Sequence, residues 1–316
     1  MLLIVQDSDC RAHETPPGHP ERVDRFDAVN RAVEALPQDS YKLETARPAT
    51  RAELERLHAP GYIGRVEQIC AEGGGALDPD THAVPATWTA ALKAAGGAIQ
   101  GVEHVLAGRG RAAFNAGRPP GHHAFRAQAM GFCFFNNVAL AAAAALEAHG
   151  LSRVLIVDWD VHHGNGTQAL FYAEPRVFFF SMHQYPFWPG TGGAEERGAG
   201  PGSGFTLNVP LAQNLSRLEI RQRFTNALEQ IAARFEPELV LISAGFDMHR
   251  ADPLGGLSLE SADFGEMTQE LATRFLNKGS ACRGLVSTLE GGYDLPALEA
   301  SVAAHLQALK EIARIG

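Results

Sequence analysis

The 316-residue sequence has few cysteines and none at close spacing. Its four cysteines, Cys10, Cys70, Cys133 and Cys282, are scattered, and no C-x-x-C pair occurs. This spacing excludes a zinc ribbon and a disulfide framework. The N-terminus has no basic stretch before its short apolar run, and no apolar run approaches the length of a membrane span. We therefore expect a cytoplasmic protein with no membrane partner.

Basic residues are also scarce relative to acidic ones. The 27 Lys and Arg residues against 36 Asp and Glu residues give a net charge of -9 at pH 7. A nucleic-acid-binding surface would be basic, so nucleic acid is not expected as a partner. The charge permits a cationic substrate, although diffuse acidity more often serves solubility. No repeat at a fixed period is present, and no glycine-rich phosphate loop follows a strand, which sets nucleotide binding aside.

Strand-like and helix-like segments alternate along the chain. Strands are expected at residues 2–5, 111–115, 154–157, 177–181, 239–243 and 285–289. Helices are expected at about residues 19–36, 85–107, 136–149, 217–234, 261–277 and 296–315. Residues 73–79 and 186–204 are expected to be loops, and the Gly96-Gly97 pair indicates close backbone packing. The alternation predicts an α/β fold, a single domain over residues 1–316 with an open, mainly parallel sheet and helices on both faces.

The most informative stretch is the apolar run 154–157 together with the polar residues directly after it. The run ends abruptly in Asp158, Asp160 and His162, which share one side if the extended backbone continues. Burying such groups is costly unless a cation or hydrogen bonds compensate. Ligands in open α/β sheets bind at the carboxyl ends of the strands, where these residues would lie.

Other strand ends carry residues of matching chemistry. Asp247 follows the strand at 239–243, and a parallel sheet would bring it to the same edge as Asp160 and His162. Two carboxylates and one imidazole make a three-ligand divalent site with an open position for water. This mixed nitrogen and oxygen set suits Zn²⁺ and Fe²⁺ alike. Taken alone, Asp247 would instead be interpreted as a helix N-cap.

Residues for proton transfer follow two further strands. The His122-His123 pair supplies a general base, and Asp158 and Asn165 are available to orient the two imidazoles. Tyr293, on a glycine-flanked loop, would hydrogen-bond a developing oxyanion. Together with the metal trio, these groups fit the hydrolysis of an amide.

Seven longer segments make the pattern specific. They are RPPGHHA (118–124), GFCFFNNVA (131–139), VDWDVHHGNGT (157–167), SMHQYPFWPGTG (181–192), SAGFD (243–247), DPLGG (252–256) and LEGGYD (289–294). Together with HPER (19–22), they resemble the histone deacetylase and acetylpolyamine amidohydrolase superfamily, on its class II-like bacterial amidohydrolase branch, and occur in that family's order. The resemblance implies an open α/β sheet of the arginase/deacetylase type.

The resemblance also implies the ions of the site. Zinc would be bound by Asp160, His162 and Asp247. A structural potassium ion would be held by backbone carbonyls near Asp158, Asp160 and His162, with the hydroxyl of Ser181 as a further ligand. A second potassium ion is expected near Phe171 and Val177.

Catalytic roles follow from the same resemblance. His123 would be the principal general base and acid, and His122 its electrostatic neighbour, held by Asp158. Tyr293 would polarise the acetyl carbonyl. Asn165 stands where class I members have Asp, and because an amide stabilises an imidazolium less than a carboxylate does, the order of the two histidine pKa values is left open.

The substrate tunnel is implied at four positions. Gly131 and Phe132 would line it, and Trp188 would form the opposite wall unless it only packs its loop. Leu254 stands where polyamine-preferring relatives tend to place a glutamate. A leucine at this position favours an acyl-lysine-like or otherwise apolar-stemmed substrate. Arg25 resembles a residue of an internal channel beneath the site.

Three functions are expected, in order of preference. The first is metal-dependent hydrolysis of N-acetyl amides on lysine side chains; the second is hydrolysis of acetylpolyamines or other small amides. The third is a silent module that only binds acyl groups, which would have little need for the proton shuttle of His122, His123 and Tyr293. Residues 178–180 and His163 are interpreted as buried structural residues. The sequence leaves open whether the chain forms a homo-oligomer.

Overall fold

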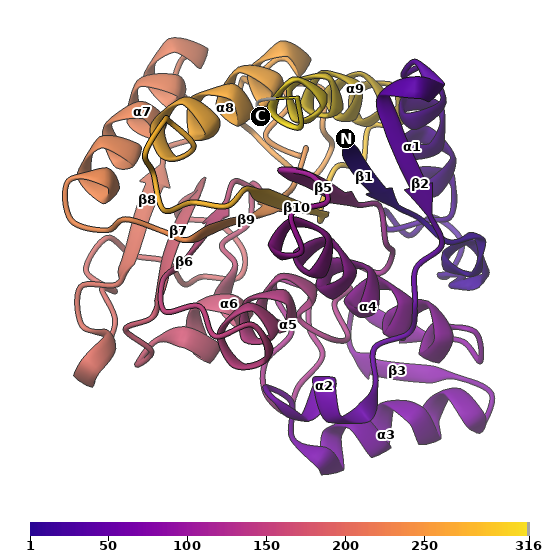
Figure 1. Ribbon diagram of the computed structural model, residues 1–316. Coiled ribbons are helices and arrows are strands. Elements are labelled where there is room, and N and C mark those ends of the chain that lie inside the picture. Colours follow the sequence, from indigo (N-terminus) through magenta and orange to yellow (C-terminus); the bar gives the residue numbers. More distant parts are fainter. Residues whose placement is uncertain (315–316) are drawn as a thin grey trace.

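A single eight-stranded sheet organises the protein (Figure 1). The computed structural model describes residues 1–314. The strand order is β2-β1-β5-β10-β9-β6-β7-β8, and every neighbouring pair is parallel. The strands are β1 (Leu2–Val5), β2 (Tyr41–Glu44), β5 (Ala112–Asn115), β6 (Val154–Asp158), β7 (Val177–Gln184), β8 (Thr206–Leu211), β9 (Leu239–Ala244) and β10 (Leu285–Leu289). The predicted fold class is confirmed.

Helices cover both faces of the sheet (Figure 1). One layer consists of α1 (Asp24–Glu34), α7 (Arg217–Ala232), α8 (Ser261–Phe275) and α9 (Leu295–Ile312). The opposite layer consists of α4 (Thr87–Leu106), α5 (Asn137–Ala143) and α6 (Asn165–Phe171). Outside it lie α2 (Arg51–Glu55), α3 (Pro60–Ala71) and the antiparallel hairpin of β3 (Gly75–Asp78) and β4 (Thr81–Ala83).

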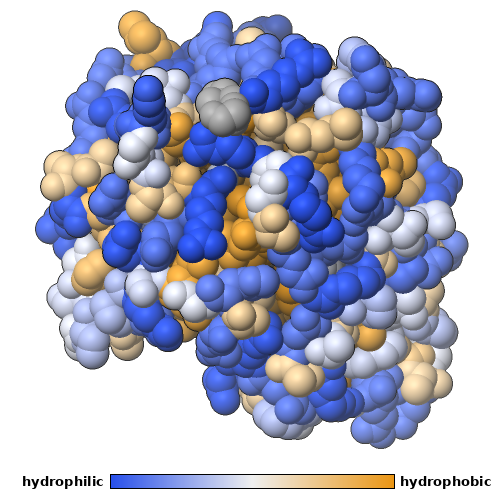
Figure 2. All heavy atoms as spheres, viewed as in Figure 1, coloured by the Kyte–Doolittle hydropathy of each residue, from blue (hydrophilic) through white to orange (hydrophobic). Residues whose placement is uncertain are grey.

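The two helix layers explain the uninterrupted apolar strands. Within β6, Leu155 and Val157 belong to the core cluster on one face of the sheet, and Val154 and Ile156 to the cluster on the other. A strand covered on both faces needs apolar residues at every position. The segment 178–180 is core strand, as predicted. On the face seen in Figure 2, hydrophilic side chains cover the helices, and apolar side chains gather between the two layers.

Several elements differ from the prediction. The sequence missed β2, β8, α2, α3 and α6, and residues 73–79, expected as a loop, contain β3. Helix α1 begins at Asp24 rather than His19, because Glu21 is drawn inward to an ion pair with Arg118. The helix after Asn136 changes to a π-helical turn at Ala144–Ala148. The expected end of the last helix, residue 315, lies outside the described residues.

The strand order places a crevice between β6 and β9. From β6 the chain runs outward through β7 and β8, and it then returns to β9 on the other side of β6. Loops that leave such a switch point diverge, which opens a ligand crevice at the carboxyl ends of the two strands. Among residues 1–314, no helix combines the length and the apolar character needed to cross a bilayer.

The predicted close packing at Gly96 is confirmed and gives a test of the fold. A Cβ at Gly96 would collide with the backbone of residues 47–49, whereas one at Gly64 in α3 would meet no atom within 4 Å. We expect Gly96→Ala to lower the free energy of unfolding by about 1–3 kcal/mol through overpacking. The control Gly64→Ala is expected to raise it by about 0.5–1 kcal/mol, because alanine favours a helix. Urea denaturation measures both, and equal effects would contradict the packing described here.

Candidate active site

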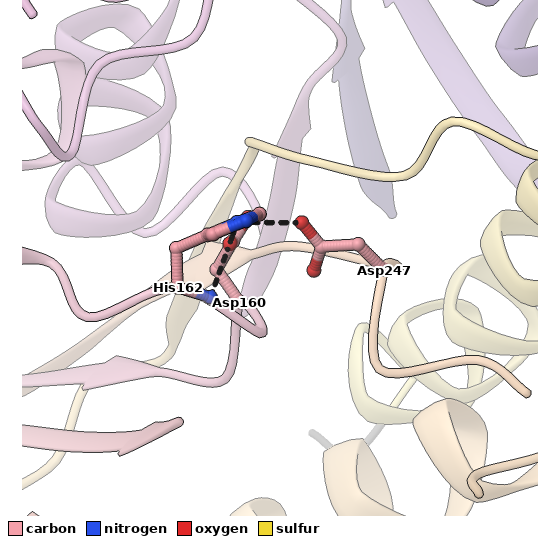
Figure 3. A group of neighbouring side chains, drawn as sticks. All are labelled: Asp160, His162 and Asp247. Atoms are coloured by element: carbon pink, nitrogen blue, oxygen red, sulfur yellow. Dashed lines mark hydrogen bonds and ion pairs between the residues drawn. The ribbon is translucent and has the colours of Figure 1, made fainter. Parts of the chain in front are cut away.

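Three side chains converge in the crevice (Figure 3). Asp160 and His162 lie in the loop after β6, and Asp247 lies in the loop after β9. Nδ1 of His162 is 3.0 Å from Oδ1 of Asp160 and 3.3 Å from Oδ2 of Asp247. One ligand atom from each residue falls within 4.8 Å of the others, and all three side chains are buried. The structure therefore brings together the trio that the sequence singled out.

The extended backbone does not continue through this segment, so the condition under which the three residues would share one side of a strand is not met. Strand β6 ends at Asp158, so Asp160 and His162 project from a loop. The carboxylate of Asp158 turns to His122 and also accepts a hydrogen bond from the backbone N–H of Asp160, at 3.1 Å. Asp158 thus stands behind the trio and is not a member of it.

Backbone N–H groups hold both carboxylates, and that of His162 donates to Oδ1 of Asp160 at 2.9 Å. The N–H of Gly291 donates to Oδ2 of Asp160, and that of Val161 donates to Oδ1 of Asp247, each at 2.8 Å. Oδ2 of Asp247 is buried without a hydrogen-bond partner among the described residues. An N-cap role for Asp247 is not observed, because its carboxylate bonds the β6 loop and the next helix, α8, begins only at Ser261. A buried carboxylate oxygen with no donor is costly unless a cation faces it.

The charges of the trio also call for a cation. Burial and the neighbouring charge of Asp160 raise the pKa of Asp247 to about 8. Burial lowers the pKa of His162, but the adjacent carboxylates of Asp160 and Asp247 outweigh it and raise the pKa to about 9. A divalent ion would relieve the repulsion that raises the pKa of Asp247, and the carboxylate and imidazole donors fit such an ion.

The paired histidines stand beside the trio. Nδ1 of His122 is 3.0 Å from Oδ2 of Asp158, and Nδ1 of His123 is 2.8 Å from Oδ1 of Asn165. Burial lowers the pKa of His122, but nearby carboxylates, Asp158 foremost, raise it to about 10. Burial and the positive charge of His122 hold the pKa of His123 well below its usual value. The order that the sequence left open is therefore a protonated His122 beside a neutral His123.

Glu290 is a buried carboxylate that the sequence analysis missed. It accepts hydrogen bonds from the backbone N–H groups of Gly121 (2.7 Å) and His122 (3.1 Å). Burial raises its pKa to about 7. The sequence does contain an indication of Glu290: it is a polar residue directly after an apolar strand, as Asp158 is after the apolar run 154–157.

Tyr293 closes the opposite side of the site. Its backbone N–H donates to Oδ2 of Asp252 at 2.6 Å, and the guanidinium of Arg25 lies 4.9 Å from its ring centre. Burial raises the pKa of its phenol well above the usual value, so the hydroxyl keeps its proton. Arg25 is itself fully buried and donates to Glu21 and to the carbonyl of Gly292.

A cavity of about 250 Å³ joins these groups. Its lining includes His122, His123, His162, Tyr293 and all four of the expected substrate residues, Gly131, Phe132, Trp188 and Leu254. The lining also includes Asp80, Phe187 and Pro120, which the sequence analysis did not single out.

Two features shape the walls of this cavity. Trp188 meets the ring of His123 edge-on at 4.7 Å between centroids, so it forms a wall rather than only packing its loop. Phe132 has φ of 68°, a conformation that non-glycine residues rarely adopt and that tends to mark functional sites.

The residues expected near each potassium ion lie close to one another in the fold. Ser181 pairs with Asp158 across β6 and β7, and its hydroxyl lies 2.9 Å from Nδ1 of His183. Phe171 ends α6 and Val177 begins β7. Both potassium sites stay predictions.

Comparison with known proteins places the chain in a family. The family model described as the histone deacetylase domain matches residues 19–309. The chain belongs to the histone deacetylase family. The resemblance carried by the sequence motifs is thereby confirmed, as is the general class of deacetylase or amidohydrolase.

Three relatives illustrate the range of this family. Uncharacterized protein slr0245 of Synechocystis sp. is 39% identical and aligns over 98% of this chain and 99% of its own length. The histone deacetylase-like amidohydrolase of Pseudomonas aeruginosa is 41% identical over 80% of this chain, and human polyamine deacetylase HDAC10 is 40% identical over 97%. The alignments span 66% and 46% of those two proteins. The crystal structure of the HDA15 HD domain superposes with a TM-score of 0.90 at 35% identity and covers 99% of this chain and 88% of that one.

The protons held by the trio predict how metal affinity changes with pH. Because the pKa values of Asp247 and His162 are raised to about 8 and 9, an arriving ion has to displace a proton below those values. Each displaced proton raises the Kd for Zn²⁺ about tenfold for every unit that the pH falls, so with both protons displaced we expect a rise of up to about a hundredfold per unit between pH 8 and pH 6. Competition against a chelating dye measures this, and a Kd that does not change with pH would contradict it.

Proposed function

We propose that this protein hydrolyses the acetyl amide of acetylated lysine side chains with the aid of a bound zinc or iron(II) ion. The observation that carries the proposal is the cavity that His123, Tyr293 and His162 line together, with ligand atoms of Asp160 and Asp247 within 4.8 Å of that of His162. Phe132, Phe187 and Trp188 line the cavity, which suits the apolar stem of an acyl-lysine.

The ion would supply Lewis acidity and lower the pKa of a water molecule in the site. His123, neutral and oriented by Asn165, accepts the proton of the water that attacks the acetyl carbon. His122 keeps its own proton, because Asp158 and Glu290 stabilise its charge. The positive charge of His122 then keeps His123 a weak base, able to release its proton again.

The protonated phenol of Tyr293 donates a hydrogen bond to the acetyl oxygen as negative charge develops there. The C–N bond breaks as His123 passes its proton to the leaving amine, and acetate and the free lysine amine are the products. A module that only binds acyl groups would have no use for a neutral imidazole beside a protonated one, so a silent module is the weaker proposal.

An acetylpolyamine is the alternative substrate. One observation favours it: the human relative that aligns with 97% of this chain is named a polyamine deacetylase. Leu254 favours acetyl-lysine, because it presents an apolar side chain to the cavity where a carboxylate would be needed to pair with a distal ammonium. The cytoplasmic location and any homo-oligomer stay predictions.

Removal of the phenol or the imidazole tests the proposed chemistry. We expect Tyr293→Phe and His123→Ala each to lower kcat on a fluorogenic acetyl-lysine peptide by about 10²- to 10⁴-fold, the usual contribution of an acid–base or oxyanion group. Metal content is expected to stay near one ion per chain, since neither residue belongs to the trio. Tyr172→Phe, at a tyrosine that lines a separate cavity beside α6, is the matched control. Wild-type turnover in either site variant would contradict the proposal.

Leu254→Glu tests the substrate class. A carboxylate at this wall is expected to attract the distal ammonium of acetylspermidine, which raises its kcat/KM relative to an acetyl-lysine peptide by about tenfold or more. Leu254→Gln, of similar shape but without the charge, is expected to leave the ratio within about twofold. An unchanged ratio in the Glu variant would show that Leu254 does not set the preference.

A further inference from the structure

The cavity wall that carries Phe187 and Trp188 belongs to a loop with little structure of its own. This wall loop, residues 185–196, follows β7 and contains glycines at 190, 192 and 193. The ring of Phe187 stacks on His162 at 5.5 Å, and that of Trp188 meets His123 edge-on. Glycine-rich chain is conformationally free, so the loop needs specific contacts to hold the two aromatic side chains against the site.

Glu196 is the residue best placed to hold the loop. Its Oε1 accepts hydrogen bonds from the backbone N–H groups of both Gly192 and Gly193, each at 2.9 Å. Its Oε2 accepts a hydrogen bond from the side-chain amide of Gln168 on α6. One carboxylate thus ties the middle of the wall loop to a helix of the sheet-covering layer.

A buried polar cluster continues from Gln168 toward the metal trio. Oε1 of Gln168 accepts hydrogen bonds from Asn208 (2.7 Å) and from Nε2 of His163 (3.0 Å). On its other side, Nδ1 of His163 accepts a hydrogen bond from the hydroxyl of Thr191 in the wall loop, at 2.8 Å. Because His163 directly follows His162 in the chain, the bond from Thr191 to His163 fixes the position of the wall loop relative to the trio.

A second histidine supports the same loop from β7. Nε2 of His183 donates to the carbonyl of Gly192 at 3.0 Å. A Cβ at Gly192 would collide with the rings of both His163 and His183, so the loop lies directly on this cluster. The side chains of His163, His183, Gln168 and Asn208 are all buried, and none of them lines the cavity that His123 and His162 line.

We propose that Glu196 is a positioning residue: it fixes Phe187 and Trp188 against His162 and His123 and thereby sets the affinity for the apolar stem of the substrate. This inference rests on the proposed function, because it concerns the binding of the acyl-amine chain. It goes beyond that function in assigning a role to a residue that touches neither substrate nor metal.

The test combines kinetics with the fluorescence of Trp188, which is 40% exposed, whereas Trp159 is fully buried and Trp88 is partly buried. We expect Glu196→Ala to raise KM for an acetyl-lysine peptide about tenfold, comparable to the loss of one hydrogen bond to a charged group, with kcat within about twofold. In the metal-free protein, acrylamide quenching of tryptophan emission is expected to increase. This increase is expected to vanish when Trp188→Phe is combined with Glu196→Ala.

Two further variants make the test specific. Glu196→Gln keeps an oxygen that accepts from the two glycine N–H groups, so we expect it to restore KM to within about threefold of wild type. Glu195→Ala removes the adjacent, exposed carboxylate and is expected to change neither KM nor quenching. Thr191→Val removes only the bond to His163 and is expected to change KM and quenching in the same direction as Glu196→Ala. It replaces Glu196→Ala in the test if Glu196→Ala does not fold.

The outcomes separate this inference from the proposed function. Wild-type KM and quenching in folded Glu196→Ala or Thr191→Val would overturn the positioning role. So would an equal effect of Glu195→Ala, or a fall in kcat with KM unchanged. If the wild-type protein hydrolyses no acetyl amide, the proposed function fails, and the quenching data still decide whether Glu196 holds the wall.

Discussion

Two buried carboxylates that face one imidazole are the constraint on which the rest of the site depends. Asp160 and Asp247 lie where water cannot screen them, and burial together with mutual repulsion raises the pKa of Asp247 to about 8. The parallel sheet forces this encounter, because the loops after β6 and β9 leave the same crevice. Gly245 and Gly291 allow it, since a Cβ at either position would collide with these carboxylates. A divalent cation is the simplest way to stabilise the arrangement.

Charges of alternating sign surround this centre. His122 carries a proton between Asp158 and Asp160, and the carboxylate of Glu290 lies behind its backbone. Further in, the fully buried Glu21 pairs with both Arg25 and Arg118. Burial raises the pKa of Glu21, but Arg118 outweighs it and holds the pKa well below its usual value. The buried charges of Glu21, Arg25, Arg118, His122 and Asp158 each have an opposite neighbour, which lowers the cost of burying them.

The sequence predicted the elements that packing dictates and missed those that depend on tertiary contacts. The strands buried on both faces, such as β6 and β9, have unbroken apolar runs, and the polar residues directly after them indicated the metal trio. Strand β2 has no fully buried residue, and β8 contains Pro210, so neither gives a strand signal. Asp80 was missed because its turn joins β3 to β4, a hairpin outside the main sheet. Glu196 was missed because its role depends on a loop conformation that no local pattern specifies.

Strand register explains why so much chemistry collects at one edge. Neighbouring strands align a single row of polar residues across the sheet: Asn115, Thr288, Ser243, Asp158, Ser181 and Asn208. Within the row, the side-chain amide of Asn115 donates to the hydroxyl of Thr288 at 2.9 Å. The row passes beneath the histidine pair through Asp158 and reaches the cluster behind the wall loop through Asn208. The metal trio, the paired histidines and the wall loop therefore all lie against this one row of polar residues. A shift of any one strand by a residue would separate them.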